Sequence, residues 1–251
     1  MIQPPVSAFI LAAGLGTRMK STKAKVLHMV SSKPMIHHVV QTVNSIGFDK
    51  VFVVVGHQKE EVMAVLDDFQ ISFVVQEEQL GTGHAVLCAE NQLQDIGGIV
   101  MILNGDVPLI SKDSIEKMLA KHQDRKPVLT IMTTQLDDPT NYGRILRTKQ
   151  GQILAIIEEK DATPEQRKIN EINAGIYCAE VPFLFEALHK VGTDNSQGEI
   201  YLTDIVKIAI GMGQQVEIFG GASAEEVLGV NSKIELAAAN DYLQKKKNSK
   251  L

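Results

Sequence analysis

Short unbroken apolar runs, rich in β-branched residues, recur through the first hundred residues of the chain. They lie at 6–12, 51–55, 73–75 and 99–103. Runs without apolar–polar alternation are typical of strands buried on both faces of a parallel sheet. Segments with helical spacing separate them, at 36–43, 62–66 and 85–93. This order of strand and helix predicts a doubly wound, mainly parallel α/β sheet, which binds ligands beyond the carboxyl ends of its strands.

The rhythm of the sequence changes after Lys126. Apolar segments follow at 128–134, 144–147 and 153–158, with turn residues at 137–139 and 150–151. Short strands joined by such turns are typical of antiparallel hairpins. We therefore expect a small antiparallel lobe, which would give a substrate site its second wall. A helical stretch follows at 231–247.

The composition is that of an ordinary globular protein. Of the 251 residues, 44% are hydrophobic and 22% are charged, and the net charge is −5, which suits one main domain. A pI near 5.8 without a concentrated Lys/Arg face argues against binding to nucleic acid. No apolar run reaches the roughly 18 residues that span a bilayer. From the charge and the apolar runs we expect no nucleic-acid or membrane partner. Cys88 and Cys178 have neither zinc nor disulfide spacing, so we expect a cytoplasmic protein.

A glycine-rich segment with two cations directly follows the first predicted strand. Gly14 and Gly16 leave backbone N–H groups open to an anion, and Arg18 and Lys25 can neutralise a triphosphate. The segment is not the dinucleotide-binding fingerprint, because Met19 stands where a third Gly or Ala belongs. A plain glycine turn with solvated cations is the alternative. The coincidence of glycines and cations at one strand end favours a triphosphate site.

Asp106 and Gln76 follow two other predicted strands. Asp106 reaches the same edge of the sheet through a glycine turn after 99–103, and its alternative role is that of a turn former before Pro108. Since Mg²⁺ in phosphate-transfer sites takes one or two protein carboxylates and completes its shell with phosphates and water, one Asp is a sufficient start. Gln76, ahead of the glycine segment 80–83, offers the donor and acceptor that match the edge of uracil, although an isolated Gln is a weak signal.

Nine motifs together give the chain a family resemblance. They are Leu11 to Met19, Lys25 to His28, Gln79 to His84, Gly105 to Leu109, Asp137 to Arg144, Lys160 to Thr163, Glu171 to Asn173, Gln197 to Glu199 and Gly229 to Asn231. Over nearly its whole length the chain resembles the uridylyltransferase domain of the bifunctional N-acetylglucosamine-1-phosphate uridylyltransferase / glucosamine-1-phosphate acetyltransferase family. The resemblance implies a Rossmann-like nucleotide-diphospho-sugar transferase fold. It also implies an enzyme that, with Mg²⁺, transfers UMP from UTP to N-acetylglucosamine 1-phosphate, giving pyrophosphate and the cell-wall precursor UDP-N-acetylglucosamine.

The same resemblance implies roles for particular residues. Those implied to bind the nucleotide are Leu11, Ala13, Gly14, Gln76, Gly81 and Thr82. Those implied to contact or lie near the sugar are Gly143, Glu158, Asn173, Glu199, Tyr201 and Thr203. Arg18, Lys25 and Asp106 would be catalytic, and Asp106 and Asn231 would hold Mg²⁺. Residues 1–229 would form the transferase domain and residues 230–251 a C-terminal helix. In the family this helix leads into a left-handed β-helix, which this sequence lacks. We therefore expect a monomer or a weak homo-oligomer.

Three positions depart from the family pattern. Asn104 stands where Tyr is common, Leu15 replaces a Lys seen in some members, and Ala24 lies where Pro often precedes the lysine. Loss of a loop cation would weaken triphosphate affinity, and the change at Asn104 would alter contacts near the nucleotide or the metal. Two alternatives therefore stay open: another sugar-1-phosphate nucleotidylyltransferase, and a protein that binds nucleotide sugars without catalysis.

Overall fold

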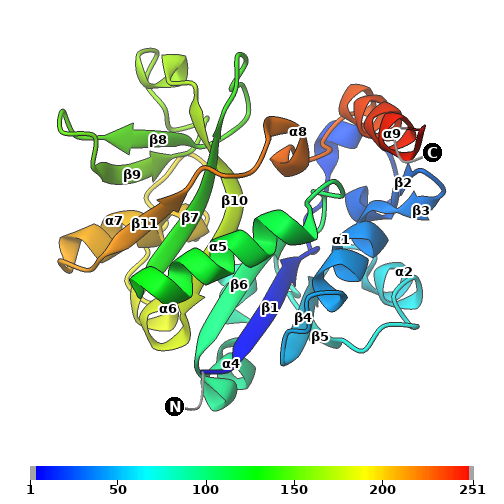
Figure 1. The fold of residues 1–251 in the computed structure, drawn as a ribbon, viewed down its shortest axis with the longest axis horizontal. Helices are drawn as coiled ribbons and strands as arrows, with labels where there is room; N and C mark the ends of the chain where they lie inside the picture. Colours follow the sequence, from blue (N-terminus) through cyan, green and yellow to red (C-terminus); the bar gives the residue numbers. More distant parts are fainter. Residues whose placement is uncertain (1–3, 249–251) are drawn as a thin grey trace.

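The computed structural model describes residues 4–248, and within them a nine-stranded mixed sheet runs through the centre (Figure 1). In spatial order its main strands are β11 (Val216–Phe219), β7 (Leu129–Gln135), β10 (Glu171–Glu180), β6 (Ile99–Asn104), β1 (Val6–Leu11), β4 (Lys50–Val55) and β5 (Ser72–Val75). β1 is parallel to β4 and to β6, and β4 is parallel to β5. The predicted doubly wound, mainly parallel sheet is confirmed, and the bounds of these four strands lie within one residue of the predicted runs.

β10 makes the sheet mixed. It runs antiparallel to β6 on one side and to β7 on the other, and it also pairs with β8 (Arg144–Arg147), which forms a hairpin with β9 (Ile153–Ile157). This hairpin is the antiparallel addition that the turn residues predict, whereas β7 joins the main sheet parallel to β11. A separate two-stranded antiparallel sheet pairs β2 (Met29–Val30) with β3 (Lys33–Pro34). The hydrophobic pattern alone indicates neither β10 nor β11.

Helices cover both faces of the sheet. Those on one face are α1 (Met35–Asn44), α2 (Lys59–Ala64) and α5 (Lys112–Arg125), and those on the other are α3 (Thr82–Leu87), α4 (Glu90–Ile96), α6 (Val181–Leu188) and α7 (Ile205–Gly211). Neighbouring residues of β1 enter opposite layers, because Ile10 belongs to the core under the first group and Phe9 to the core under the second. The unbroken apolar runs follow from this arrangement, since every residue of a doubly covered strand faces a core.

Two predicted helices differ from the pattern in extent. The stretch 85–93 forms two helices, because Ala89 leaves the helical conformation (φ −104°, ψ 10°) and caps α4. The stretch 231–247 forms α9 (Lys233–Asn248), whose Asn240 Oδ1 accepts a hydrogen bond from Ser31 N (2.7 Å) beside β2. Shorter helical segments are α8 (Ala224–Val227) and the 3₁₀ turns Thr17–Met19, Lys25–Leu27, Gln166–Lys168 and Leu202–Asp204. Within residues 4–248, none of the helices combines the length and the apolar character that a membrane crossing needs.

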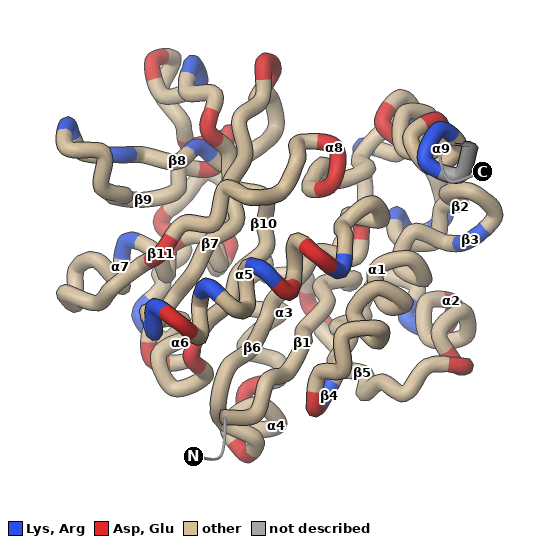
Figure 2. The backbone as a smooth tube through the Cα atoms, in the orientation of Figure 1, with Lys and Arg blue, Asp and Glu red and all other residues tan. Residues whose placement is uncertain are grey.

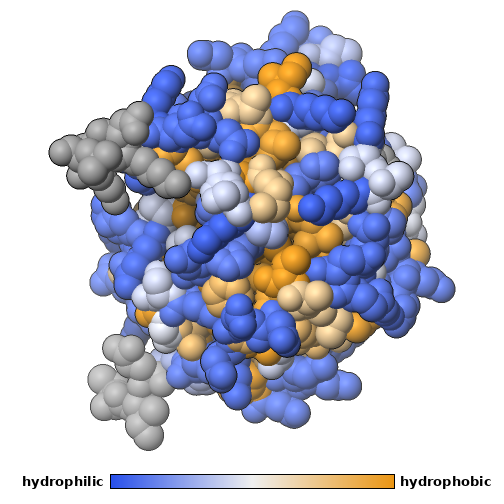
Figure 3. All heavy atoms as spheres, turned by 90° about the vertical axis from the view of Figure 1, so that its right-hand side faces the viewer, coloured by the Kyte–Doolittle hydropathy of each residue, from blue (hydrophilic) through white to orange (hydrophobic). Residues whose placement is uncertain are grey.

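The surface mixes charged and apolar side chains. Lys, Arg, Asp and Glu are spread over the helices and loops in the view of Figure 2. The face that carries β2, β3 and α9 shows an apolar band among polar residues (Figure 3). Met29 of β2 and Ile234 of α9 are among the exposed large apolar side chains.

Shortening Ile10 to valine is expected to lower the free energy of unfolding by about 1 kcal/mol, because Ile10 is fully buried and the lost methylene leaves a gap. Urea unfolding measures the change. Ile234→Val is the matched control, since that side chain is 83% exposed and the same substitution should change stability by less than about 0.5 kcal/mol. Equal losses in the two variants would contradict the placement of Ile10 in the core.

Candidate functional site

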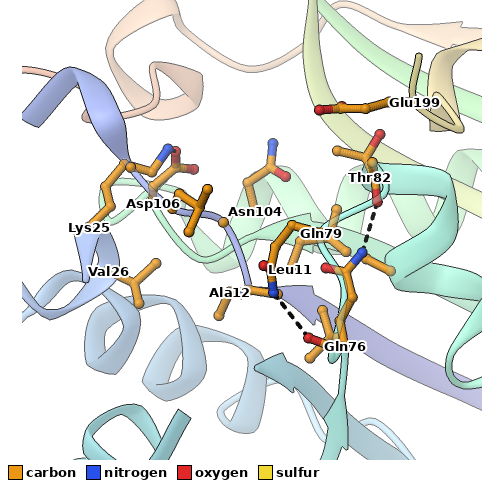
Figure 4. A pocket seen from close by; sticks show the side chains of 17 residues that line it. Leu11, Ala12, Lys25, Val26, Gln76, Gln79, Thr82, Asn104, Asp106 and Glu199 are labelled. Atoms are coloured by element: carbon orange, nitrogen blue, oxygen red, sulfur yellow. Dashed lines mark hydrogen bonds and ion pairs between the residues drawn. The ribbon is translucent and has the colours of Figure 1, made fainter. Parts of the chain in front are cut away.

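The glycine loop after β1 opens a cleft at the carboxyl ends of the strands. Gly105 N donates a hydrogen bond to Leu11 O (2.8 Å), which ties the end of β1 to the turn after β6. Gly16 has a φ of +62°, and a Cβ there would lie 2.5 Å from the Cβ of Lys25. Only glycine allows this close approach of the two segments. The loop thereby brings Lys25 to the wall of a cavity of ≈ 440 Å³ (Figure 4).

All six residues predicted to bind a nucleotide line this first cavity. They are Leu11, Ala13, Gly14, Gln76, Gly81 and Thr82. Gln76 is buried, and its Nε2 donates to Gly81 O (3.1 Å). Gly81, with φ +110°, lies so close to Ile200 O that a Cβ would come within 2.5 Å of it. The Thr82 hydroxyl accepts a hydrogen bond from Leu202 N (3.0 Å). The polar groups of this cavity are therefore held in place by the protein itself.

Three distant segments meet at one end of the first cavity. Lys25 forms an ion pair with Asp106, and its Nζ donates a hydrogen bond to Asn231 Oδ1 (3.0 Å), 206 residues away along the chain. Arg18 Nη2 donates to the same oxygen of Asn231 (2.8 Å). We call these four residues the charge centre. The side chains of Lys25 and Asp106 are only 18% and 13% exposed, so solvent screens their attraction weakly.

The first turn of α9 positions Asn231. Ser232 Oγ accepts a hydrogen bond from Glu235 N (3.2 Å), as in a helix N-cap, and Glu235 Oε2 accepts one from Asn231 N (2.7 Å). Val230 N donates to Asp106 O (2.9 Å). The Ser-x-x-Glu sequence at 232–235 therefore fixes where the helix begins and holds Asn231 next to Asp106.

The donor atoms of the charge centre suit a hard cation. Asp106 offers a carboxylate and Asn231 an amide oxygen, and both contact the same ammonium group. Among the residues that the structure describes, no group of three or more His, Cys, Asp or Glu side chains is arranged to hold a metal ion. Mg²⁺ fits this sparse oxygen set, because it commonly takes one or two protein ligands and keeps water and phosphate for the rest. Zinc prefers nitrogen and sulfur ligands in fuller protein sets.

A second cavity of ≈ 270 Å³ adjoins the first. Five residues line both cavities, namely Leu11, Lys25, Thr82, Asn104 and Asp106. Four residues predicted to contact a sugar line the second cavity, namely Gly143, Glu158, Asn173 and Thr203. The charge centre therefore lies where the two cavities meet.

Hydrogen bonds fix two polar side chains in the second cavity. Asn173 Nδ2 donates to the Tyr177 hydroxyl (2.6 Å), and Asn173 Oδ1 accepts from Gly175 N (3.0 Å). The pairing of β10 with β7 shifts register between Asn173 and Tyr177, as in a β-bulge, which re-aims side chains. The Thr203 hydroxyl donates to Glu158 Oε1 (3.1 Å). Both side chains are thus oriented before a ligand arrives.

Two further residues predicted to lie near a sugar line other hollows. Glu199 lines the first cavity. Tyr201 is buried and lines a third hollow of ≈ 480 Å³, together with Asp161. Glu158 and Thr203 line both this hollow and the second cavity and so form a shared wall. The structure brings Glu199 and Tyr201 close to the second cavity but not into its lining.

Comparison with known proteins places the chain in a family. Residues 8–170 match the family model of the MobA-like NTP transferase domain. Over 244 residues the chain is 51% identical to the bifunctional protein GlmU of Desulfotalea psychrophila. The matched region covers 97% of this chain and 72% of that protein. The chain belongs to the GlmU family. The resemblance that the motifs indicate is therefore confirmed, and as a member of the NTP transferase family the chain is a nucleotidyltransferase.

Other GlmU proteins are longer than this chain. Identity is 44% over 241 residues to GlmU of Halalkalibacterium halodurans and 45% over 242 residues to GlmU of Geobacter sulfurreducens. These matches cover 96% of the chain but 53% and 51% of the two relatives, so the GlmU-family chain spans about half their length.

Solved structures of more distant proteins share the fold of this GlmU-family chain. A UDP-glucose pyrophosphorylase crystallised with UDP-glucose matches with a TM-score of 0.77 at 20% identity, covering 98% of this chain and all of that one (100%). A putative glucose-1-phosphate thymidylyltransferase from Bacillus anthracis, in complex with sucrose, matches with a TM-score of 0.73 at 19% identity and 94% coverage of both chains. At these identities the likeness establishes the fold alone.

Two residues of this GlmU-family chain matter to the site although the sequence pattern does not single them out. Tyr142 lines the second cavity, where burial, with the charges of Glu235 and Asp106, raises the pKa of its hydroxyl to about 12. The hydroxyl therefore stays protonated at neutral pH. Arg144 is fully buried behind it and donates to Tyr142 O and to Glu159 Oε2 (2.6 Å). The only sequence signal for either is their place in the motif that ends at Arg144.

The Glu158 carboxyl of the GlmU-family chain has an altered proton affinity. Burial raises its pKa, the hydrogen bond from Thr203 partly opposes this, and the charges of Asp161 and Asp204 add to it. A carboxyl whose pKa is higher in the folded state than in the unfolded state binds its proton more tightly when folded. Its contribution to stability is therefore fully present below the unfolded pKa and is lost as the pH rises through the folded pKa.

Glu158→Gln replaces the carboxyl by a neutral side chain of the same shape. It is expected to raise the melting temperature above that of the wild type, and by more at pH about 8 than at pH about 4. At pH about 4 the Glu carboxyl is half protonated even in the unfolded state, so less of its charge remains to be removed. The gain should be roughly 2–4 °C for each kcal/mol recovered. Thermal unfolding at both pH values measures it. The exposed Glu165, changed to Gln, is the control and should show the same difference at both pH values. If Glu158→Gln also changed the melting temperature by the same amount at both pH values, burial would not raise the pKa of Glu158.

Proposed function

We propose that the chain transfers UMP from UTP to N-acetylglucosamine 1-phosphate, with Mg²⁺, to give UDP-N-acetylglucosamine and pyrophosphate. The observation that carries this proposal is the position of the charge centre between two cavities of different character. One cavity presents the Gln76 amide and glycine backbone, and the other presents Asn173 and Glu158. The reacting phosphates of two substrates would meet at Lys25 and Asp106.

In this proposal the first cavity takes UTP. Gln76, held by its bond to Gly81 O, would pair with the edge of the uracil ring, which has one acceptor next to one N–H donor. Thr82 begins α3 close to the same place. Leu11, Ala13 and Gly14 would lie along the nucleotide, and the backbone of the loop would face the phosphates.

The second cavity would take the sugar. Gly143, Glu158, Asn173 and Thr203 would contact its hydroxyl and acetamido groups. Hydroxyl-rich ligands need several fixed donors and acceptors, and the bonds from Thr203 to Glu158 and between Asn173 and Tyr177 supply such fixed groups. Glu199 and Tyr201 would act on the sugar from the adjacent hollows.

The proposed reaction needs no general base, because the phosphate of a sugar 1-phosphate already carries ionised oxygens near neutral pH. One of these oxygens attacks the α-phosphorus of UTP in line, the new P–O bond forms, and the bond to the β-phosphate breaks as pyrophosphate leaves. Mg²⁺, held by Asp106 and Asn231, would supply charge neutralisation to the reacting phosphates. Arg18 and Lys25 would orient the triphosphate and stabilise charge on the leaving group, so their task is positioning and electrostatics.

We also propose a division of the chain into a transferase unit at 1–229 and a C-terminal helical segment at 230–251. α9 occupies most of the described part of that segment, from Lys233 to Asn248, and residues 1–3 and 249–251 lie outside the described residues. We propose a monomer or a weak homo-oligomer, which light scattering over a range of protein concentrations tests.

The experiment for the main proposal is pyrophosphate release from UTP and N-acetylglucosamine 1-phosphate, with and without Mg²⁺. The other nucleoside triphosphates and glucose 1-phosphate are run beside this pair. Metal-dependent turnover restricted to the pair supports the proposal. Turnover with a different pair would assign another nucleotidyl transfer, and binding of UDP-N-acetylglucosamine without any turnover would mark a binding protein and overturn the proposal.

A further inference from the structure

In the charge centre, the side chains of Lys25 and Arg18 contact the oxygen atoms that are proposed to bind the metal. The ammonium of Lys25 is paired with Asp106 and donates to Asn231 Oδ1 (3.0 Å), while Arg18 Nη2 donates to that same oxygen (2.8 Å). An amide oxygen has two lone pairs, so both acceptor positions of Asn231 are in use. A metal ion that binds Asp106 and Asn231 together must therefore displace at least one of these donors.

We propose that Lys25 and Arg18 bind to the metal ligands Asp106 and Asn231 while no nucleotide is present. They move away from these ligands when the polyphosphate of a nucleotide binds. This inference rests on the proposed function and deepens it. It makes metal and nucleotide bind cooperatively, because the nucleotide supplies new anionic partners for the two cations and thereby frees the metal ligands. The free protein then binds a divalent ion weakly.

Electrostatics favours an exchange of cations over their coexistence. Lys25 and Asp106 are largely shielded from water, so an ammonium and a divalent ion on the same oxygens repel each other strongly. Either cation alone neutralises Asp106. The pair with Lys25 thus avoids a largely shielded carboxylate without a partner, which is costly.

The geometry lets the cations move while the ligands stay. Asn231 is held through its backbone by Glu235, and Asp106 accepts a backbone hydrogen bond from Val230. Lys25, by contrast, has a flexible four-carbon stem and lines both cavities, so its ammonium can reach a phosphate without a change in the backbone. Arg18 is exposed and lines the second cavity, which leaves its guanidinium free to turn.

The test is Mn²⁺ binding to the nucleotide-free chain, followed by electron paramagnetic resonance of the free ion. Lys25→Met keeps the length of the side chain and removes its charge. We expect it to tighten Mn²⁺ binding about tenfold, within the range of roughly 5- to 150-fold that is typical of coupled sites. The double variant with Asp106→Asn should lose this gain. Lys25→Gln serves as a second variant if Lys25→Met melts at a much lower temperature.

Lys20→Met is the matched control, since Lys20 is an exposed lysine of the same loop and the change removes the same charge. Equal tightening by Lys20→Met would show a general effect of charge and overturn the inference. Tight binding that survives in the double variant would place the ion elsewhere and overturn it too. Metal-dependent turnover by the wild type, together with unchanged Mn²⁺ affinity in Lys25→Met, would overturn this inference and leave the proposed reaction standing. Tightening in Lys25→Met without any turnover by the wild type would uphold the inference and contradict the proposed reaction.

Discussion

Asp106→Ala is expected to slow pyrophosphate release by about a hundredfold or more while leaving the protein folded. The change removes the carboxylate that faces Lys25 in the charge centre, and with it the proposed carboxylate ligand of Mg²⁺. The main chain at this position keeps its hydrogen bond from Val230 N (2.9 Å), so the segment before α9 stays in place. Steady-state release of pyrophosphate at saturating UTP and sugar phosphate measures the loss.

Asp113→Ala is the control for the loss of one carboxylate. The Asp113 side chain is 71% exposed on α5, pairs with Lys117 one helical turn away, and lines neither of the two cavities. Its removal should leave the rate within about twofold of wild type, because an exposed pair of this kind contributes about 1 kcal/mol or less. Activity of Asp106→Ala close to that of wild type in Mg²⁺ would contradict the metal assignment.

Arg144→Met is expected to lower the free energy of unfolding by about 3 kcal/mol, near the lower end of the range for breaking a buried ion pair. Arg144 is 1% exposed, and its Nη2 donates to Glu159 Oε2 (2.6 Å) and to Arg167 O (3.3 Å). Methionine fills the space but leaves these acceptors and Tyr142 O without donors. The loss stays moderate because Glu159 is 26% exposed and keeps some contact with water. Guanidinium unfolding measures it.

Arg147→Met on the same strand is the comparison. Arg147 is 35% exposed, and its partner Glu171 (2.7 Å) keeps the hydrogen bond from the Thr133 hydroxyl (3.1 Å), so the loss should be smaller, about 1.5 kcal/mol. Arg144 also holds the backbone of Tyr142 at the second cavity, so its replacement should raise the KM for the sugar phosphate more than the KM for UTP. A loss of stability no larger than that of Arg147→Met would show that the buried pair is dispensable.

The glycine loop and Asp106 could be predicted from the sequence because both follow short, β-branched apolar runs that are typical of buried strands. Adjacent parallel strands end at the same edge of a sheet, so residues just beyond their carboxyl ends meet there. The structure accordingly pairs β1 with β6 and brings Lys25 to Asp106. This part of the site follows from local pattern and topology alone.

Other parts of the site depend on contacts that no local pattern records. Asn231 meets Arg18 across 213 residues of sequence, and only the family resemblance points to it. Arg144 lies in a short strand with the appearance of an exposed hairpin, and its burial depends on the carboxylate and carbonyls that converge on it. Tyr201 lies behind the wall formed by Glu158 and Thr203, a placement decided by packing.

Because Asn231 reaches the charge centre only when the first turn of α9 is in place, the order of synthesis sets when the site exists. The loop with Lys25 and the turn with Asp106 leave the ribosome long before Asn231 does, and until then the carboxylate has only its lysine partner. A nascent chain that lacks this segment can fold much of the sheet yet lacks an oxygen of the charge centre. The charge centre is therefore complete only once the first turn of α9 has folded next to the turn that carries Asp106.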